Sequence, residues 1–564
     1  SRRFASPRSL LVCLSVLSSP FLFSLRFALS SLVYSHFSEA FVFKMVIARS
    51  HVQLVLFFVF LFSFDAVSLG HASSAASLRS PSSPCLVRNQ KQFEACLQSE
   101  SQLHVQLLSP ARYRLPDGQV PARPLLIEGM GTAESFLLQG SLRVDISSAA
   151  EHERIASATA ASPVSWSASL PSQTLLALRN LTFEAPPAES LGATRPLVHV
   201  SAPTTGVHLA VLTVSMQWCS FRGGLSAAQP ASAAQLLVEG ALVAELRDSS
   251  FRHAVGPAVV LRNSHATSPH LLLGVLFEEN RSPAAAAQQS DAIDLLLVEA
   301  SAQLVGCRFL GGRCEREAAA TPAPSWFPSL LQSPSPHTAP SLPPALRQRV
   351  SARGGTSTAA HHHLEVSQCT FGDYGTAQQP CGSLLHQSGS DAPLTVSDSD
   401  FLLLHAEDQP AIYTEASLAL LRHVSLQRVQ CSSAACVWAL VCTGNLELDS
   451  CSLLGSLADV AAVSVFGDTL TLSGEVTVRG HILMEEGGPA AALVRTVQTR
   501  GADAAATVYG SLIVSAAQEV HLQGDHSSAL VTVAALELSA PLRILKHSWQ
   551  INSLLAKGSD VHLS

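Results

Sequence analysis

A motif of eight residues recurs nine times between positions 176 and 453 and constrains the fold more than any other feature. Its first, third, sixth and eighth positions hold mostly apolar or small residues. Residues two apart lie on the same face of a strand, so each motif predicts two short strands joined by a bend, each strand with one buried face. The eighth positions are Phe183, Phe221, Phe251, Phe277, Phe309, Phe371, Phe401, Leu426 and Leu453.

The spacing of the motifs indicates a solenoid. Successive eighth positions are 25 to 38 residues apart, apart from one interval of 62. A coil of that length cannot bury its apolar face alone and must stack on its neighbours, about 4.8 Å away. We therefore predict an all-β chain that forms a single-stranded right-handed parallel β-helix. Its interior should hold one ladder of phenylalanines and another of cysteine, serine and valine, and its hand follows from the crossover rule for parallel strands.

The long interval contains residues 318–363, which are rich in proline, serine and alanine. Such a composition buries little surface, so we predict a large disordered loop inserted into a continuous stack. The alternative is a linker between two solenoids, but the motif resumes unchanged after the interval. The β-helix is expected over residues 85–454. A less regular continuation is expected over 455–564, where stretches such as Leu470–Leu472 still alternate.

The pattern Φ-x-Φ-x-x-C-x-F, in which Φ is apolar, resembles the parallel β-helix repeat of the pectin-lyase-like superfamily. The segment Gln92–Cys96 followed by Leu103–Leu115 is similar to the first coil of that family, in which a short capping helix precedes a strand and a Pro-Gly-x-Tyr-like turn. Here Ala111 replaces the glycine, and Leu125–Gly131 resembles the second coil. The resemblance covers about residues 90–454. It implies a right-handed β-helix, in a family whose enzymes act on polysaccharides along a groove on one sheet.

The N-terminal residues predict export. Residues 1–44 resemble a translated upstream region or a gene-model artefact, and Met45 is the first methionine. Residues 45–72 have the layout of a signal peptide: Arg49, a 13-residue apolar run over Val52–Phe64, and small residues that allow cleavage after Gly70 or Ala72. Residues 73–84 then form a linker. The predicted location is extracellular or at the cell surface, and the alternative is an uncleaved membrane anchor.

Cysteines and glycosylation sequons agree in part with export. Cys85 and Cys96 flank the first coil and are the disulfide candidate among the 12 cysteines. The cysteines at sixth motif positions are expected to be buried thiols; they are Cys219, Cys307, Cys369 and Cys451. Asn180 and Asn280 begin the two glycosylation sequons. Asn180 should point outward because Leu181 occupies an inward position, whereas Pro283 weakens the second sequon.

The search for catalytic groups gives no assignment. The Gly-His-Gly and Arg-Ile-Lys motifs of the polygalacturonase-like branch are absent from the sequence. Asp398 and Asp400 flank an inward Ser399, and two carboxylates could perform general acid and base catalysis. We favour two solvated turn aspartates. His361–His363 is a run of three, which lets few ligands converge on one ion, and His270 stands at an inward position, so no metal or cofactor site is predicted.

These observations favour a secreted, non-catalytic β-helix protein with a cell-surface, adhesive or glycan-binding role. The alternative is an atypical polysaccharide lyase or glycoside hydrolase of the same superfamily. A third class, an autotransporter-like passenger, lacks the expected C-terminal barrel pattern. The net charge is −7 without a basic run, which argues against nucleic acid. The expected partner is a polysaccharide or cell-surface glycan; a membrane becomes a partner only if the N-terminal segment is an uncleaved anchor.

Overall fold

A computed structural model of the chain describes the body of the β-helix. The described residues are 83–116, 118–161, 173–185, 196–204, 209–223, 234–262, 268–282, 292–314, 348–353, 363–375, 383–388, 392–406, 410–431, 440–455, 461–484, 494–526, 528–545, 548–556 and 561–563. The predicted upstream region and signal peptide lie outside these residues, as do residues 318–347 and 354–362 of the predicted insertion.

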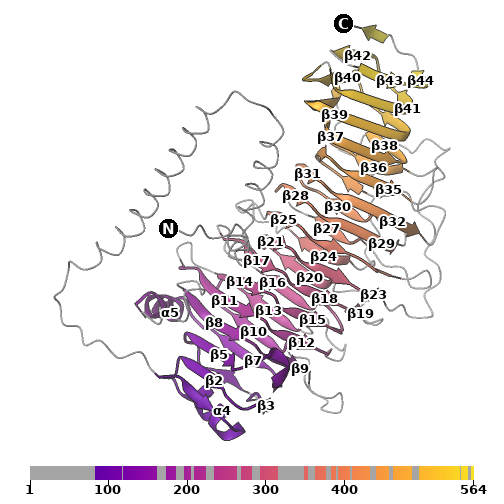
Figure 1. The fold of residues 1–564 in the computed structure, drawn as a ribbon. Helices are drawn as coiled ribbons and strands as arrows, with labels where there is room; N and C mark the ends of the chain where they lie inside the picture. The colour runs from indigo at the N-terminus through magenta and orange to yellow at the C-terminus, as the bar shows by residue number, and fades with distance from the viewer. Residues whose placement is uncertain are drawn as a thin grey trace, which may run out of the picture. The chain divides into compact units, whose positions relative to one another are not determined.

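The chain folds as a parallel β-helix, as predicted. A system of 43 strands is connected by parallel pairing, and each strand pairs with the strand that occupies the same place in the next coil. Figure 1 shows the coils following one another from the indigo N-terminal end to the yellow C-terminal end. The strands form three sheets, numbered 1 to 3 in the order in which a coil visits them. A separate pair, β19 (Arg281–Ser282) and β23 (Arg313–Cys314), extends two neighbouring coils.

Sheet 1 begins each coil. Its strands are β1 (Cys85–Val87), β2 (His104–Leu107), β5 (Leu125–Gly129), β8 (Thr174–Arg179), β11 (Leu212–Gln217), β14 (Leu242–Arg247), β17 (His270–Leu273), β21 (Ala302–Val305), β25 (Leu364–Ser367), β28 (Leu394–Ser397), β31 (Leu418–Arg422), β34 (Asn445–Asp449), the first parts of β37 (Thr469–Arg479) and β39 (Val494–Val514), β40 (Glu519–Gly524), β42 (Leu542–Leu545) and β45 (Val561–Leu563).

Sheet 2 follows the bend predicted by the motif. Its strands are β3 (Ala111–Arg114), β6 (Phe136–Gln139), β9 (Thr182–Glu184), β12 (Ser220–Arg222), β15 (Ser250–Arg252), β18 (Leu276–Glu278), β22 (Arg308–Leu310), β26 (Thr370–Phe371), β29 (Asp400–Ala406), β32 (Ser425–Cys431), β35 (Ser452–Gly455), the end of β37, the middle of β39, the first part of β41 (Leu530–Leu538) and β43 (Ser548–Ile551).

Sheet 3 closes each coil. Its strands are β4 (Gln119–Val120), β7 (Leu142–Asp145), β10 (Val198–Ser201), β13 (Leu236–Glu239), β16 (Val259–Arg262), β20 (Ala292–Val298), β24 (Gln348–Arg353), β27 (Leu385–Ser388), β30 (Ile412–Thr414), β33 (Leu440–Cys442), β36 (Ala461–Val465), β38 (His481–Met484), the ends of β39 and β41, and β44 (Leu554–Ala556).

Stacked phenylalanine rings fill the interior next to sheet 2. From Phe183 to Phe401, seven rings follow one another at centroid distances of 4.6 to 5.4 Å and lie within 16° of parallel. Register forces this arrangement, because each eighth motif position pairs with the eighth position of the next coil. The predicted phenylalanine ladder is confirmed.

The sixth motif positions form the second predicted ladder, and hydrogen bonds explain its cysteines. The thiols of Cys219, Cys307, Cys369 and Cys451 donate to a carbonyl of the preceding coil at 3.3 to 3.5 Å. A small side chain with a donor suits this tight bend, where the backbone leaves sheet 1. Burial raises the pKa of Cys219 to about 12 and that of Cys451 to about 11, so both thiols stay protonated.

The fifth motif position adopts a left-handed backbone conformation in every coil of the repeat. The chain must turn sharply there between sheets 1 and 2, with φ between 47° and 63°. Glycine, asparagine and aspartate tolerate this region best, and a bulky residue is unusual in it. The column comprises Asn180, Trp218, Asp248, Gly274, Gly306, Gln368, Asp398, His423, Ser450 and, in the coil that follows the ninth motif, Gly474.

The N-terminal end of the stack is covered by a short helix, α4 (Gln90–Gln98), visible beside β2 and β3 in Figure 1. A disulfide joins Cys85 of β1 to Cys96 of the helix, the pair predicted from the sequence. The guanidinium of Arg123 is buried beneath the helix C-terminus and donates to the carbonyls of Leu97 and Gln102, both at 2.9 Å. This charge offsets the negative end of the helix dipole.

A second helix, α5 (Ala149–Ala161), was not predicted. Its N-terminus is capped, because Ser148 accepts a hydrogen bond from the backbone of Glu151 at 3.2 Å while Glu151 accepts from Ser147. Ile155 packs into the main core, and a ring nitrogen of the buried His152 lies 2.6 Å from the Ala210 carbonyl. A short η1 turn (Ala133–Ser135) precedes β6.

The stack is continuous across the long interval. Phe309 of β22 pairs directly with Phe371 of β26. Within the range predicted to be a disordered loop, however, residues 348–353 form β24, which pairs with β20 and β27 of sheet 3. The prediction is wrong for these residues, because the coil needs a third strand between β22 and β25. Parallel pairing also continues after residue 455 through strands β36 to β45.

Candidate functional site

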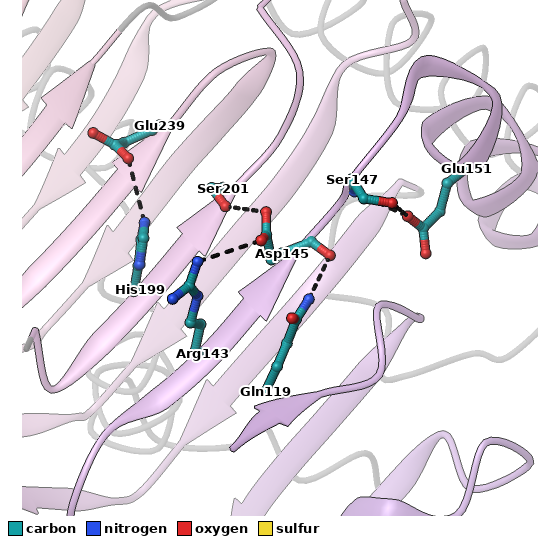
Figure 2. A network of polar contacts seen from close by, with 8 residues as sticks. All are labelled: Gln119, Arg143, Asp145, Ser147, Glu151, His199, Ser201 and Glu239. Carbon is teal, nitrogen blue, oxygen red and sulfur yellow. Dashed lines mark hydrogen bonds and ion pairs between the residues drawn. The ribbon is translucent and has the colours of Figure 1, made fainter. Parts of the chain in front are cut away.

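A network of polar side chains lies on the outer face of sheet 3 near its N-terminal end (Figure 2). The register places Asp145 of β7, Ser201 of β10 and Glu239 of β13 side by side. Arg143 and His199 lie two residues earlier on their strands and therefore face the same way. Three coils thus bring together residues that are almost 100 positions apart in the sequence.

Asp145 has a partner for each carboxylate oxygen. The Ser201 hydroxyl donates to Oδ1 at 2.6 Å, and a guanidinium nitrogen of Arg143 lies 3.4 Å from Oδ2. Gln119 donates to the backbone carbonyl of Asp145 at 2.9 Å. The carboxylate is therefore held in place by its neighbours.

Glu239 is paired in the same manner. A ring nitrogen of His199 and a guanidinium nitrogen of Arg262 each lie 3.3 Å from one of its oxygens. The hydrogen bond from His199 lowers the pKa of Glu239, helped by the positive charges of His199 and Arg262, while partial burial opposes the shift. Glu239 thus favours its ionised form.

This arrangement is unsuited to acid–base catalysis on a glycosidic bond. A general acid needs a raised pKa, but that of Glu239 is lowered. Asp145 and Glu239 stand two strands apart, roughly 10 Å between backbones, and each is engaged by a cation. Among the described residues there is also no group of three His, Cys, Asp or Glu side chains that could hold a metal ion.

Asp398 and Asp400 lie at the bend between sheets 1 and 2. Asp398 occupies the left-handed fifth position, and its carboxylate lies 3.1 Å from a ring nitrogen of His423 in the next coil. Both side chains of this pair are more than half exposed. Asp400 is exposed at the start of β29, and Ser399 between the two aspartates is buried. Of the two, Asp398 has a side-chain partner, and that partner is at the surface.

The two sequon asparagines lie in different environments. Asn180 occupies the left-handed bend and is half-buried, with its amide nitrogen 3.3 Å from the Gly129 carbonyl. Asn280 is fully buried: its amide nitrogen donates to Asp294 at 2.7 Å, and its oxygen accepts from the Ala254 backbone at 2.8 Å. A sugar on Asn280 would displace these buried contacts; glycosylation of Asn180 and of Asn280 stays a prediction.

His270 and His363, the two described histidines considered as candidate ligands, each hydrogen-bond to the backbone. His270 is buried inside the stack, where one ring nitrogen accepts from the Ala244 backbone at 2.8 Å. Burial lowers the pKa of His270 to about 3. A ring nitrogen of His363 lies 2.9 Å from the Pro393 carbonyl. His361 and His362 lie outside the described residues.

A hydroxyl ladder on the outer face of sheet 2 was missed by the sequence analysis. The ladder begins at the outward seventh position of the last two motifs, and strand pairing continues it as serine or threonine through the next three coils. The ladder consists of Ser425, Ser452, Thr477, Thr507 and Thr532. Only its first two members lie in the motif; strand pairing places the other three in the same column.

Comparison with known proteins adds no relative: neither a family model nor a curated protein matches the chain. Among the described residues, no helix has the length and apolar character needed to cross a membrane.

Proposed function

We propose that the chain is a secreted β-helix protein without catalytic activity that serves a cell-surface, adhesive or glycan-binding role. We also propose that it belongs to the pectin-lyase-like superfamily, on the resemblance of its repeat and its first coils. The observation that carries the functional proposal is the pairing in the sheet 3 network. Each carboxylate there is held by a cation and a further hydrogen-bond donor, a state that suits a fixed polar surface.

Export is part of this proposal. The support is the signal-like segment over residues 45–72, together with the Cys85–Cys96 disulfide, since disulfides persist mainly in oxidising compartments. Expression from Met45 in a secretory host should yield a released product whose N-terminus lies near Gly70 or Ala72. N-terminal sequencing decides between this and an uncleaved anchor.

The functional test combines binding with turnover. The secreted protein is applied to a glycan array and, in parallel, incubated with pectate, alginate and neutral glycans with and without Ca²⁺. We expect retention on at least one glycan and no release of unsaturated products or reducing ends. Turnover would favour the lyase or hydrolase alternative, and its loss in Glu239→Gln or in Asp398→Asn with Asp400→Asn would locate the site.

A further inference from the structure

The hydroxyl ladder of sheet 2 differs from the equivalent columns of the other two sheets. Sheet 1 carries Leu420, Glu447, Thr471 and Gln498 at its outward positions in the same coils. The corresponding column of sheet 3 is Tyr413, Val441, Ser464 and Leu483, and all four side chains are buried. The sheet 1 column mixes apolar, charged and polar residues, and the sheet 3 column mixes apolar, aromatic and polar ones. Strand propensity alone favours threonine on any of the three sheets, so it does not explain a run confined to one.

The ladder hydroxyls are accessible and available. The five side chains are half-buried. Along each strand they alternate with fully buried, inward-pointing residues such as Leu453, Val478 and Val533. The Ser425 hydroxyl accepts from Gln427 at 2.8 Å. Within the described part of the chain, the hydroxyls of the other four ladder residues make no hydrogen bond.

An exposed aromatic ring borders the ladder. Tyr509 lies two residues beyond Thr507 on β39, and its side chain faces the same side of the sheet. It is 62% exposed, the largest exposed fraction among the bulky apolar and aromatic side chains of the described residues. The guanidinium of Arg479 lies 5.9 Å from the ring centroid, which holds the ring at the surface.

We propose that the hydroxyl ladder and Tyr509 form a binding strip for a neutral, extended β-1,4-linked glycan. Each ladder hydroxyl can donate and accept, which matches the hydroxyls of a sugar, and an aromatic ring stacks on the apolar face of a pyranose. The coil repeat of about 4.8 Å is close to the length of one sugar unit. A glycan lying along the stack therefore meets one hydroxyl of the ladder per residue. This inference rests on the proposed glycan-binding role and names its surface and ligand class.

The test uses the full chain with amorphous cellulose as the solid probe and cellohexaose as the soluble one. The triple variant Thr477→Val, Thr507→Val, Thr532→Val removes three hydroxyls but keeps the branched side-chain shape that suits a strand. Tyr509→Ala removes the ring. Thr395→Val, on the outer face of sheet 1, is the matched control. We expect the triple variant and Tyr509→Ala each to weaken binding about tenfold or more, and the control to bind like the unmodified chain.

The outcomes distinguish the binding strip of the hydroxyl ladder and Tyr509 from the more general glycan-binding role. If the unmodified chain binds neither cellulose probe, or if the triple variant binds as well as the control, the strip is wrong. Retention of the chain on another glycan of the array, unaffected by the triple variant, would leave the glycan-binding role standing without this surface. If no glycan is retained, both the strip and the glycan-binding role fail. Circular dichroism of each variant shows that a loss of binding is not a loss of fold.

Discussion

At the scale of single residues, stacking determines which side chains the fold cannot lose. Phe309 is fully buried between the rings of Phe277 and Phe371, at 4.8 and 4.6 Å. Truncating it leaves a cavity that the parallel backbones on either side cannot close. We expect Phe309→Ala to lower the free energy of unfolding by about 3–5 kcal/mol. Urea denaturation checks this value, and a loss no larger than that of the exposed variant Tyr509→Ala would contradict the ladder.

The left-handed corner makes a second residue-scale prediction. Asp398 has φ of 48°, a conformation that penalises a side chain without local polar contacts by about 1 kcal/mol or more. We expect Asp398→Ala to destabilise the protein by about that amount and Asp398→Gly to be close to neutral. The ion pair with His423 is exposed and contributes little. Denaturation curves of the two variants should keep this order; equal losses would place the cost in the ion pair and not in the backbone.

Elements outside the repeat are stabilised by a few specific contacts. Arg123 reaches three carbonyls at the end of α4, those of Cys96, Leu97 and Gln102. Removing the guanidinium leaves buried acceptors without a donor. We expect Arg123→Leu to cost about 2–3 kcal/mol and to speed hydrogen exchange in α4 first. The exposed Arg112 of β3 is the matched control, and exchange that rises equally in both variants would show that Arg123 does not cap the helix.

The same elements show how far the sequence could predict the structure. Sheets 1 and 2 were predicted because their strands carry the fixed spacing of the motif. Its sixth and eighth positions, which are Cys307 and Phe309 in one coil, are two residues apart in each of the nine motifs. Sheet 3 strands such as β24 follow loops of variable length, so their position relative to the motif is not constant. The pairing of Asp145 with Ser201 and of Glu239 with His199 depends on that third strand. It therefore could not be predicted from spacing.

At the scale of the whole molecule, one buried histidine links stability to pH. His270 lies inside the stack between Ala244 and Ala302, and its Nδ1 accepts a backbone hydrogen bond. Protonation would remove that acceptor and place a charge in the core. Burial therefore lowers the pKa of His270 to about 3, against about 6.5 in the unfolded chain. Between these values the unfolded state binds more protons, so the contribution of His270 is complete above pH 6.5 and is lost as the pH falls toward 3.

This linkage gives a prediction for the acid limb of the stability curve. The unmodified protein should lose stability as the pH falls from about 6.5, and His270→Leu should flatten that slope, since leucine fits an inward position and carries no proton. The variant leaves the Ala244 amide without its acceptor, so its stability at neutral pH should be lower. The slope and not the level is therefore the measurement, taken from urea midpoints at several pH values. His423→Leu, at an exposed corner, is the control and should retain the slope. An unchanged slope in His270→Leu would contradict the burial of His270 and its lowered pKa.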